Sequence, residues 1–292
     1  VLVIAALASA ASAEPIAIDR AATILGNDKV PAECSDIDCM IDLAYAHDAK
    51  ARAIAHALLA DTGDVVGVGE TQDMDGGFRG TIHLVPEWPV ARYRRQLVWA
   101  DAAFRDYDDF FAKLFPADVA QPKYRWRDLE VKFVRSVKKH TPSAFAMPWQ
   151  VEINVQGSLL VSADRVRETL FHEIFHMNDS DHHDWSDALR TDYDAIVAKC
   201  GVDTKCLTPY APSDTKVRGG TYYAFTQNNG DPVHEYAAEL ALRYYREQRE
   251  MLRRKKLSKK AFKCGPAENA RAWDALVTEF FAGRDLVPAC KT

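Results

Sequence analysis

Two histidines four residues apart, with a glutamate directly after the first, constrain this chain more than any other feature of its sequence. His172, Glu173 and His176 form the pattern H-E-x-x-H. Ser162 stands before an amphipathic stretch and is a typical helix N-cap, so we expect a helix over residues 162–178. Residues four apart lie one turn apart on the same helix face, where both imidazoles can contact one metal ion.

The motif also carries a proton acceptor. Glu173 follows the first histidine directly and can take a proton from water activated by a zinc ion, which is the chemistry that this pattern indicates. The chain has only 9 histidines in 292 residues, so chance rarely produces the pattern. We therefore favour a metal site over a helix that merely exposes two histidines.

A catalytic zinc ion normally takes three protein ligands and leaves a position for water. One candidate for the third ligand is His182, six residues after His176. A related pattern uses a histidine at this distance, with a glycine between that turns the chain sharply. Here the glycine position holds Asp179, which tolerates left-handed geometry better than most residues. His182 therefore remains a candidate.

The second candidate is Glu235, 59 residues after His176 on an expected later helix. Glu239 lies one turn further on the same face. We expect Glu239 to accept a hydrogen bond from a liganding imidazole, His172 first among them, and so to fix its ring. The two alanines between the glutamates favour close packing of this helix on a neighbour. The sequence favours Glu235 as third ligand, with His182 and Glu239 as alternatives.

With these motifs the chain resembles the zinc peptidases of the anthrax-lethal-factor-like type, a branch of the zincins that uses a glutamate as third ligand. Two segments carry the resemblance: the H-E-x-x-H helix, and the sequence YAFT from Tyr223 followed by Glu235-x-x-Ala238-Glu239. The resemblance implies that His172, His176 and Glu235 bind Zn²⁺ and that Glu173 is the general base.

It also implies that Tyr223 polarises the scissile carbonyl. Tyr223 precedes Glu235 by twelve residues, a longer spacing than the family usually has, and residues 228–232 look like an inserted turn. Tyr222 is an alternative for the same role.

Periodicity predicts an α+β fold, with a small sheet in an N-terminal α/β part, then the active-site helix and a helical C-terminal part. The family resemblance implies that this fold is zincin-like. We expect residues 1–13 to be part of a signal peptide, 14–120 to be an N-terminal α/β region of unknown role, and 121–292 to be the zincin-type catalytic region. Expected helices cover residues 37–60, 90–115, 162–178, 185–200 and 233–256, with a last one through Phe281. Expected strands cover residues 129–137 and 149–156, after a β-rich stretch over 65–85 with a hairpin turn at Asp75–Gly77.

The strand at 149–156 alternates apolar and polar side chains, which is typical of a half-buried strand. We expect it to be the edge of the sheet and to pair with an extended substrate, which would give affinity without much sequence selectivity.

Two features predict export. Residues 1–13 are uncharged and apolar and end in Ala-Ser-Ala, as in the core and cleavage site of a secretory signal peptide. This run is shorter than the ~20 residues of a membrane-spanning helix, and no other stretch is long enough. The six cysteines are even in number, as in a disulfide-bonded secreted or periplasmic protein.

Six cysteines can pair in many ways, and the sequence leaves the connectivity open. Proximity along the chain favours three pairs of near neighbours: Cys34–Cys39, Cys200–Cys206 and Cys264–Cys290.

The charge balance argues against a nucleic-acid partner. Lys+Arg 37 against Asp+Glu 42 gives a net charge of −5. One strongly basic run stands out, residues 253–260 (RRKKLSKK). We interpret it as the solvated end of a helix, with contact to a membrane surface or a partner as the alternative.

The sequence thus predicts a secreted zinc-dependent endopeptidase whose partner is a peptide or protein substrate, with no membrane span. The alternative is a non-catalytic or narrowly specific zinc-binding module on a zincin scaffold. An intact Glu173 favours the enzyme, because a structural zinc site needs no general base.

Overall fold

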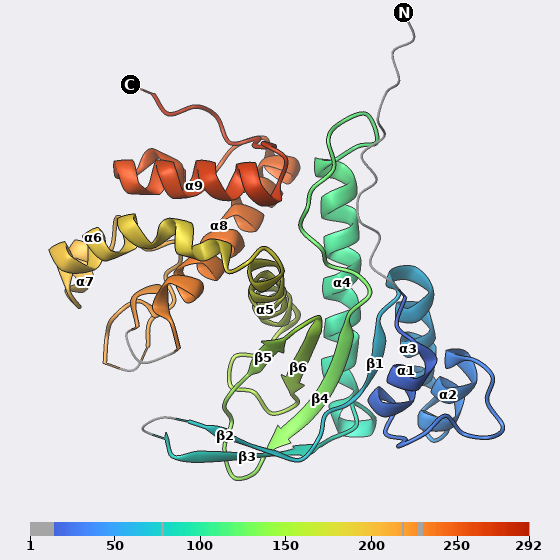
Figure 1. Cartoon of the computed structure of the whole chain (residues 1–292). Coiled ribbons are helices and arrows are strands. Elements are labelled where there is room, and N and C mark those ends of the chain that lie inside the picture. Colours follow the sequence, from blue (N-terminus) through green and yellow to red (C-terminus); the bar gives the residue numbers. More distant parts are fainter. Residues whose placement is uncertain (1–14, 77–78, 218, 227–229, 292) are drawn as a thin grey trace, which may run out of the picture.

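The computed structural model describes residues 15–76, 79–217, 219–226 and 230–291. The predicted leader and the tip of the predicted Asp75–Gly77 turn lie outside these residues. The described fold is α+β, with one small curled sheet among several helices (Figure 1). The helices are α1 (Ile18–Ile24), α2 (Ile37–Ala44), α3 (Ala49–Thr62), α4 (Arg94–Leu114), α5 (Ala163–Asp181), α6 (Arg190–Cys200), α7 (Thr204–Leu207), α8 (Pro232–Arg254) and α9 (Ala267–Phe280). The strands are β1 (Val65–Val68), β2 (Gln72–Asp75), β3 (Thr81–Pro86), β4 (Glu130–Ser136), β5 (Ala144–Met147) and β6 (Gln150–Asn154).

The sheet has the strand order β2-β3-β4-β6-β5, and β1 pairs with the first half of β4. β4 is parallel to β1 and to β6, whereas the other pairs are antiparallel. In Figure 1 the sheet lies at the centre, with α1–α3 beside β1 and the long α4 behind it. α5 lies between the sheet and the C-terminal helices.

The prediction that strand 149–156 is the edge of the sheet is wrong. β6 pairs with β4 on one side and with β5 on the other, so both sides of its backbone are used. Its polar face is buried as well. The polar groups there are satisfied by one another: Gln150 donates to Glu152 at 2.8 Å, and Gln72 donates to the same carboxylate at 2.9 Å. The edge strand on this side of the sheet is the short β5.

The prediction of one helix over residues 37–60 is also wrong. The chain forms α2 and α3, separated by a turn at residues 45–48. Asp48 caps α3 by accepting a hydrogen bond from the backbone of Ala51 at 3.1 Å, and it also pairs with Arg94 at 2.9 Å. Apolar periodicity continues through the turn, so the pattern alone does not locate the break. Helix α1 was not predicted at all.

An aromatic cluster fixes α5 in the molecule. Phe171, the residue before the first histidine of the motif, stacks between Tyr124 at 5.0 Å and Tyr245 of α8 at 4.5 Å. Tyr107 of α4 meets the same ring edge-on at 5.6 Å. Each such contact contributes about 0.5–1.5 kcal/mol beyond the burial of apolar area. The cluster therefore holds α4, α5 and α8 in a fixed relation around the motif.

The predicted disulfide pairing is confirmed. The structure contains the bonds Cys34–Cys39, Cys200–Cys206 and Cys264–Cys290. None of the helices in the described ranges combines the length and the apolar character needed to cross a membrane. The division at residue 120 stays a prediction; the sheet contains strands from both sides of it.

Candidate metal centre

Helix α5 places the two histidines of the motif as the spacing predicts. Ser162 caps the helix by accepting a hydrogen bond from the backbone of Arg165 at 3.2 Å. The Nε2 atoms of His172 and His176 lie 3.1 Å apart on one side of the helix. His172 is only 7% exposed, so its ring has few contacts with water.

Helix α8 brings a carboxylate to the same point. Pro232 occupies the first turn of α8, and the Asp231 side chain caps it by accepting from the backbone of Val233 at 3.2 Å. From this turn Glu235 places Oε2 3.1 Å from Nε2 of His172 and 3.7 Å from Nε2 of His176. The candidate ligand atoms of the three residues all lie within 4.8 Å of one another. The predicted third ligand is therefore beside the two histidines.

The other nitrogen of His172 faces a second glutamate. Glu239, one turn after Glu235, places Oε1 3.3 Å from Nδ1 of His172 and is only 4% exposed. Burial by itself would raise the pKa of Glu239, but His172 and Ser213 lower it below its ordinary value. Glu239 is thus a buried, charged group directed at the ring, as a carboxylate that orients a metal-bound histidine must be.

The electrostatics of the site favour a positive charge at its centre. Burial would lower the pKa of His172, but Glu235 and Glu239 outweigh it and raise this pKa well above its ordinary value. A group of two imidazoles and a carboxylate, with Nε2 atoms directed at one point, is a donor set that zinc prefers. These residues fit a zinc ion.

Glu173 directly follows His172 on α5 and interacts electrostatically with all three candidate ligands. The side chain is half-buried, and burial raises its pKa although His172 and His176 act in the opposite direction. Within the described ranges, Glu173 has no hydrogen bond or ion pair. Its carboxylate is therefore available to a water molecule or a substrate.

Of the two candidate tyrosines, the structure brings Tyr223 to the site. Tyr223 begins the short helix η4 (Tyr223–Phe225), its ring centre lies 5.9 Å from that of His172, and its hydroxyl is hydrogen bonded to Glu235. Burial and the neighbouring carboxylates raise the pKa of Tyr223 far above its ordinary value. Tyr222 instead bonds with Thr208 at 3.0 Å. The long spacing to Glu235 thus does not keep Tyr223 away from the site.

His182 is not brought to the site. It follows the last residue of α5, where Nδ1 contacts Glu279 at 2.8 Å and the ring packs on Phe280 at 4.7 Å. A ligand at this distance from His176 would need a sharp turn at Asp179, but α5 continues through Asp179 to residue 181.

Asp179 instead belongs to a hydrogen-bonded network that the sequence analysis missed. Its carboxylate accepts from the backbone and the hydroxyl of Ser186, each at 2.7 Å, and contacts Nδ1 of His234 at 2.8 Å. Asp179 comes three residues after His176, and His234 directly precedes Glu235. The network therefore connects α5 to the first turn of α8 next to the ligands. The closeness of Asp179 and His234 to the ligands in the sequence was the signal that could have identified it.

His234 also belongs to a second group of acidic and histidine side chains, with Asp187 and Asp231. Here a guanidinium lies between the carboxylates: Arg190 pairs with Asp231 at 2.5 Å and also with Asp187. Both carboxylates thus already have a cationic partner from the protein, the guanidinium of Arg190.

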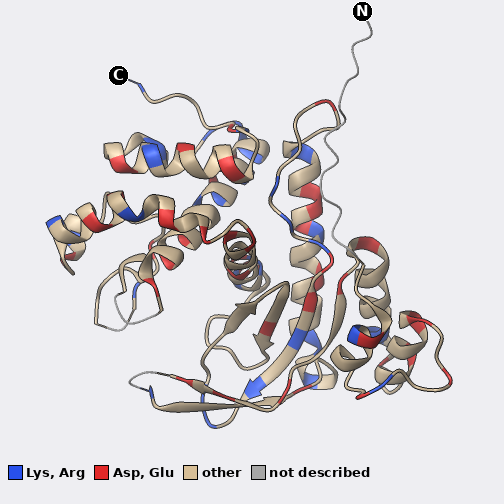
Figure 2. Ribbon diagram, in the orientation of Figure 1, with Lys and Arg blue, Asp and Glu red and all other residues tan. Residues whose placement is uncertain are grey.

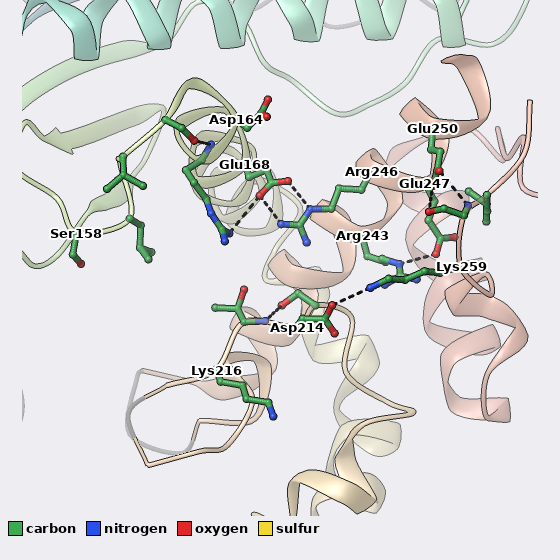
Figure 3. Close-up of a pocket in the computed structure, with 18 residues that line it drawn as sticks. Ser158, Asp164, Glu168, Asp214, Lys216, Arg243, Arg246, Glu247, Glu250 and Lys259 are labelled. Atoms are coloured by element: carbon green, nitrogen blue, oxygen red, sulfur yellow. Dashed lines mark hydrogen bonds and ion pairs between the residues drawn. The ribbon is translucent and has the colours of Figure 1, made fainter. Parts of the chain in front are cut away.

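A groove of about 950 Å³ lies between the first turns of α5, the second half of α8 and residues 213–216 (Figure 3). Its lining includes Glu168, one helical turn before His172, but none of the candidate ligands. Five acidic and five basic side chains line it, and several are paired, such as Arg246 with Glu168 at 2.7 Å and Lys259 with Asp214 at 3.2 Å. Its walls are thus polar and nearly neutral.

Comparison with known proteins adds no relative. No protein-family model, curated protein or solved structure matches the chain. The functional conclusion therefore depends on the residues and the geometry described above.

Proposed function

We propose that this chain is a zinc-dependent endopeptidase with a zincin-like catalytic region. The observation that carries the proposal is the convergence of His172, His176 and Glu235 on one point, beside a carboxylate, that of Glu173, with no partner in the described ranges. Three protein ligands leave a zinc ion with an open position, which is typical of catalytic sites rather than structural ones. Three disulfide bonds support a site of action outside the cytoplasm.

In this proposal His172, His176 and Glu235 hold the zinc ion, and Glu239 holds the ring of His172 from behind. When bound, zinc supplies Lewis acidity, which polarises a peptide carbonyl and makes water a stronger nucleophile at neutral pH. Glu173 accepts the proton of the attacking water and passes it to the leaving amine. The pKa of Glu173, raised by burial, suits a group that must both accept and release a proton.

Tyr223 supplies the hydrogen bond to the carbonyl oxygen as negative charge develops there. Its hydroxyl is bonded to Glu235, one of the proposed ligands, and so lies at the edge of the centre. A phenol with a strongly raised pKa keeps its proton, which a donor to an oxyanion must do.

The substrate would lie extended along β5. β5 is the last strand in the order of the sheet and pairs only with β6 among the described strands. It packs against α5, which carries the two histidine ligands. Main-chain pairing with an edge strand binds peptides with little sequence preference. The polar groove beyond Glu168 would then receive polar side chains of the substrate (Figure 3).

The test is cleavage of an unbiased peptide library by the zinc-loaded protein, with Glu173→Gln beside it. We expect the wild type to cleave and the variant to lose about 10²–10⁴-fold in turnover, the usual contribution of a general base, while it retains zinc. Asp181→Asn is the matched control, because it makes the same change at an exposed position of the same helix and should leave cleavage intact.

Equal cleavage by the Glu173→Gln variant would remove the assigned base. If the wild type binds zinc but cleaves no member of the library, the endopeptidase proposal fails, and a zinc-binding module becomes the better account.

A further inference from the structure

The basic end of α8 forms a second candidate site, separate from the metal centre. A hollow of about 250 Å³ lies between the start of α5 and the last turns of α8. We call it the arginine hollow. Its lining consists of Arg167, Glu168, Tyr245, Arg246, Arg249, Glu250, Arg253 and Arg254.

The arginine hollow has more positive than negative charge. Five guanidinium groups face two glutamates, and a third carboxylate, Asp106 of α4, contacts Arg249 at 2.6 Å and Arg253 at 3.4 Å. A fourth carboxylate, Asp164, contacts Arg167 at 2.8 Å, so five positive and four negative charges leave an excess of one. Arg167 lies 3.8 Å from Asp106, and its Nε is buried without a hydrogen-bond partner among the described residues. Each guanidinium of the hollow has a carboxylate nearby, and Nε of Arg167 is the donor that these carboxylates leave without a hydrogen bond in the described ranges.

The surroundings strengthen this field. Lys255, Lys256, Lys259 and Lys260 follow the hollow directly and are exposed. Along most of the ribbon, basic and acidic residues are interspersed (Figure 2), and the whole chain has a net charge of −5. A local positive excess in a recessed site concentrates anions from solution.

The lining selects the class of anion. Guanidinium groups bind phosphate oxygens through pairs of parallel hydrogen bonds, which a lysine cannot form. Liquid water occupies about 30 Å³ per molecule, so the hollow has room for a phosphate group and several waters. Tyr245 is the aromatic residue in the lining named above, and its hydroxyl donates a hydrogen bond to Asp106. A small, highly charged oxyanion fits this lining better than an apolar ligand.

We propose that the arginine hollow is a binding site for a phosphate group, carried either by a lipid headgroup or by a soluble molecule. The hollow shares Glu168, Arg246 and Glu250 with the groove of Figure 3. A phosphate-bearing ligand held here therefore lies on the two helices that also hold the metal centre. The site itself does not depend on the proposed peptidase activity.

The test uses the full chain and radiolabelled inorganic phosphate in equilibrium dialysis. Arg253→Glu together with Arg254→Glu is the test variant, because these side chains are 59% and 67% exposed and their replacement leaves the core untouched. Lys29→Glu with Lys50→Glu is the control, since it changes the net charge equally at exposed positions of the N-terminal part. We expect wild type and control to bind phosphate alike and the test variant to bind at least tenfold more weakly.

Three outcomes would overturn the proposal: no phosphate binding by the wild type, equal weakening in the control, or binding that is lost on removal of zinc but unaffected in the test variant. A vesicle assay then identifies the source of the phosphate. Tighter binding to phosphatidylcholine vesicles that contain phosphatidic acid than to vesicles of equal charge with phosphatidylserine indicates a lipid headgroup. Binding of inorganic phosphate without binding to either vesicle indicates a soluble ligand.

Discussion

Two groups of histidine and acidic side chains lie within a few residues of each other at the start of α8, and they differ in what the carboxylates face. In the metal centre the carboxylate of Glu235 faces two imidazoles and a phenol. In the second group Asp187 and Asp231 face the guanidinium of Arg190. The first group is largely buried, whereas Asp187 is 59% and Asp231 39% exposed.

This difference shows why closeness of candidate ligands does not define a metal site. A guanidinium that lies between carboxylates already supplies the positive charge and cannot be a ligand itself. Two imidazoles can supply lone pairs to a metal ion instead, and burial strengthens the attraction between such a cation and the neighbouring carboxylate. We therefore expect zinc at the first group only.

The largest expected effect separates the two groups directly. Glu235→Ala removes a ligand from the metal centre, and we expect the protein to lose its zinc at concentrations where wild type holds one ion per chain. Asp187→Ala removes a carboxylate from the second group and should leave the zinc content unchanged. Metal analysis after gel filtration measures both. A variant at Glu235 that keeps its full zinc would place the third ligand elsewhere.

The next largest effect concerns Tyr223. If its hydroxyl bonds to the oxyanion, Tyr223→Phe should lower kcat by about 10²–10³-fold, the usual loss on removal of such a donor, with zinc still bound. Tyr222→Phe is the matched control, because its hydroxyl contacts Thr208 and not the centre. Steady-state kinetics on one cleaved peptide compares them. Equal losses in the two variants would refute the assigned role.

A smaller effect is expected from the group behind the ligand. Glu239→Gln keeps the shape of the side chain but removes the charge that faces Nδ1 of His172. We expect about 10–100-fold weaker zinc binding, as is usual for the loss of such a carboxylate. Competition with a fluorescent chelator measures the change. Zinc affinity equal to that of the wild type would show that Glu239 has no part in the centre.

The smallest effect tests the idea that a buried carboxylate keeps its charge only beside a positive partner. Asp64 is fully buried, with hydrogen bonds from the backbone of Leu129 at 2.8 Å and from Thr62 at 2.7 Å, and burial raises its pKa to about 8. The folded protein therefore holds a proton that the unfolded chain releases, and stability falls as the pH rises from about 4 to about 8.

Asp64→Asn should remove this part of the pH dependence, because an amide can keep both contacts without a charge. We expect the variant to gain at least about 1 kcal/mol over the wild type between about pH 5 and pH 8, since one pKa unit corresponds to about 1.4 kcal/mol. Urea denaturation of both proteins across this range gives the difference. Parallel curves would contradict the raised pKa.

The grouping of the candidate ligands was largely predictable from sequence, because each of its two halves is a local pattern on one helix. The spacing of His172 and His176 fixes their common face, and the spacing of Glu235 and Glu239 does the same on α8. Tyr223 was identified by the family resemblance and not by its position. The network of Asp179, Ser186 and His234 was missed because no recognised motif links these three residues, although His234 directly precedes Glu235.

The fold was predictable where one element carries a strong pattern. β4, α4, α5, α8 and α9 lie close to their expected ranges. The short β5 has the sequence AFAM, which has no β-branched residue and gives little strand signal. Its absence from the prediction made β6 look like an edge, because edge position depends on pairing and not on the strand's own residues. The break between α2 and α3 was missed because the apolar periodicity continues through the turn that separates them.

The most direct test is an anomalous diffraction map, measured at the zinc absorption edge, from crystals of the zinc-loaded protein. The account predicts a peak bound by Nε2 of His172, Nε2 of His176 and the carboxylate of Glu235, and no peak between Asp187 and Asp231. A peak at the second group, or a zinc ion bound by His182 in place of Glu235, would contradict it.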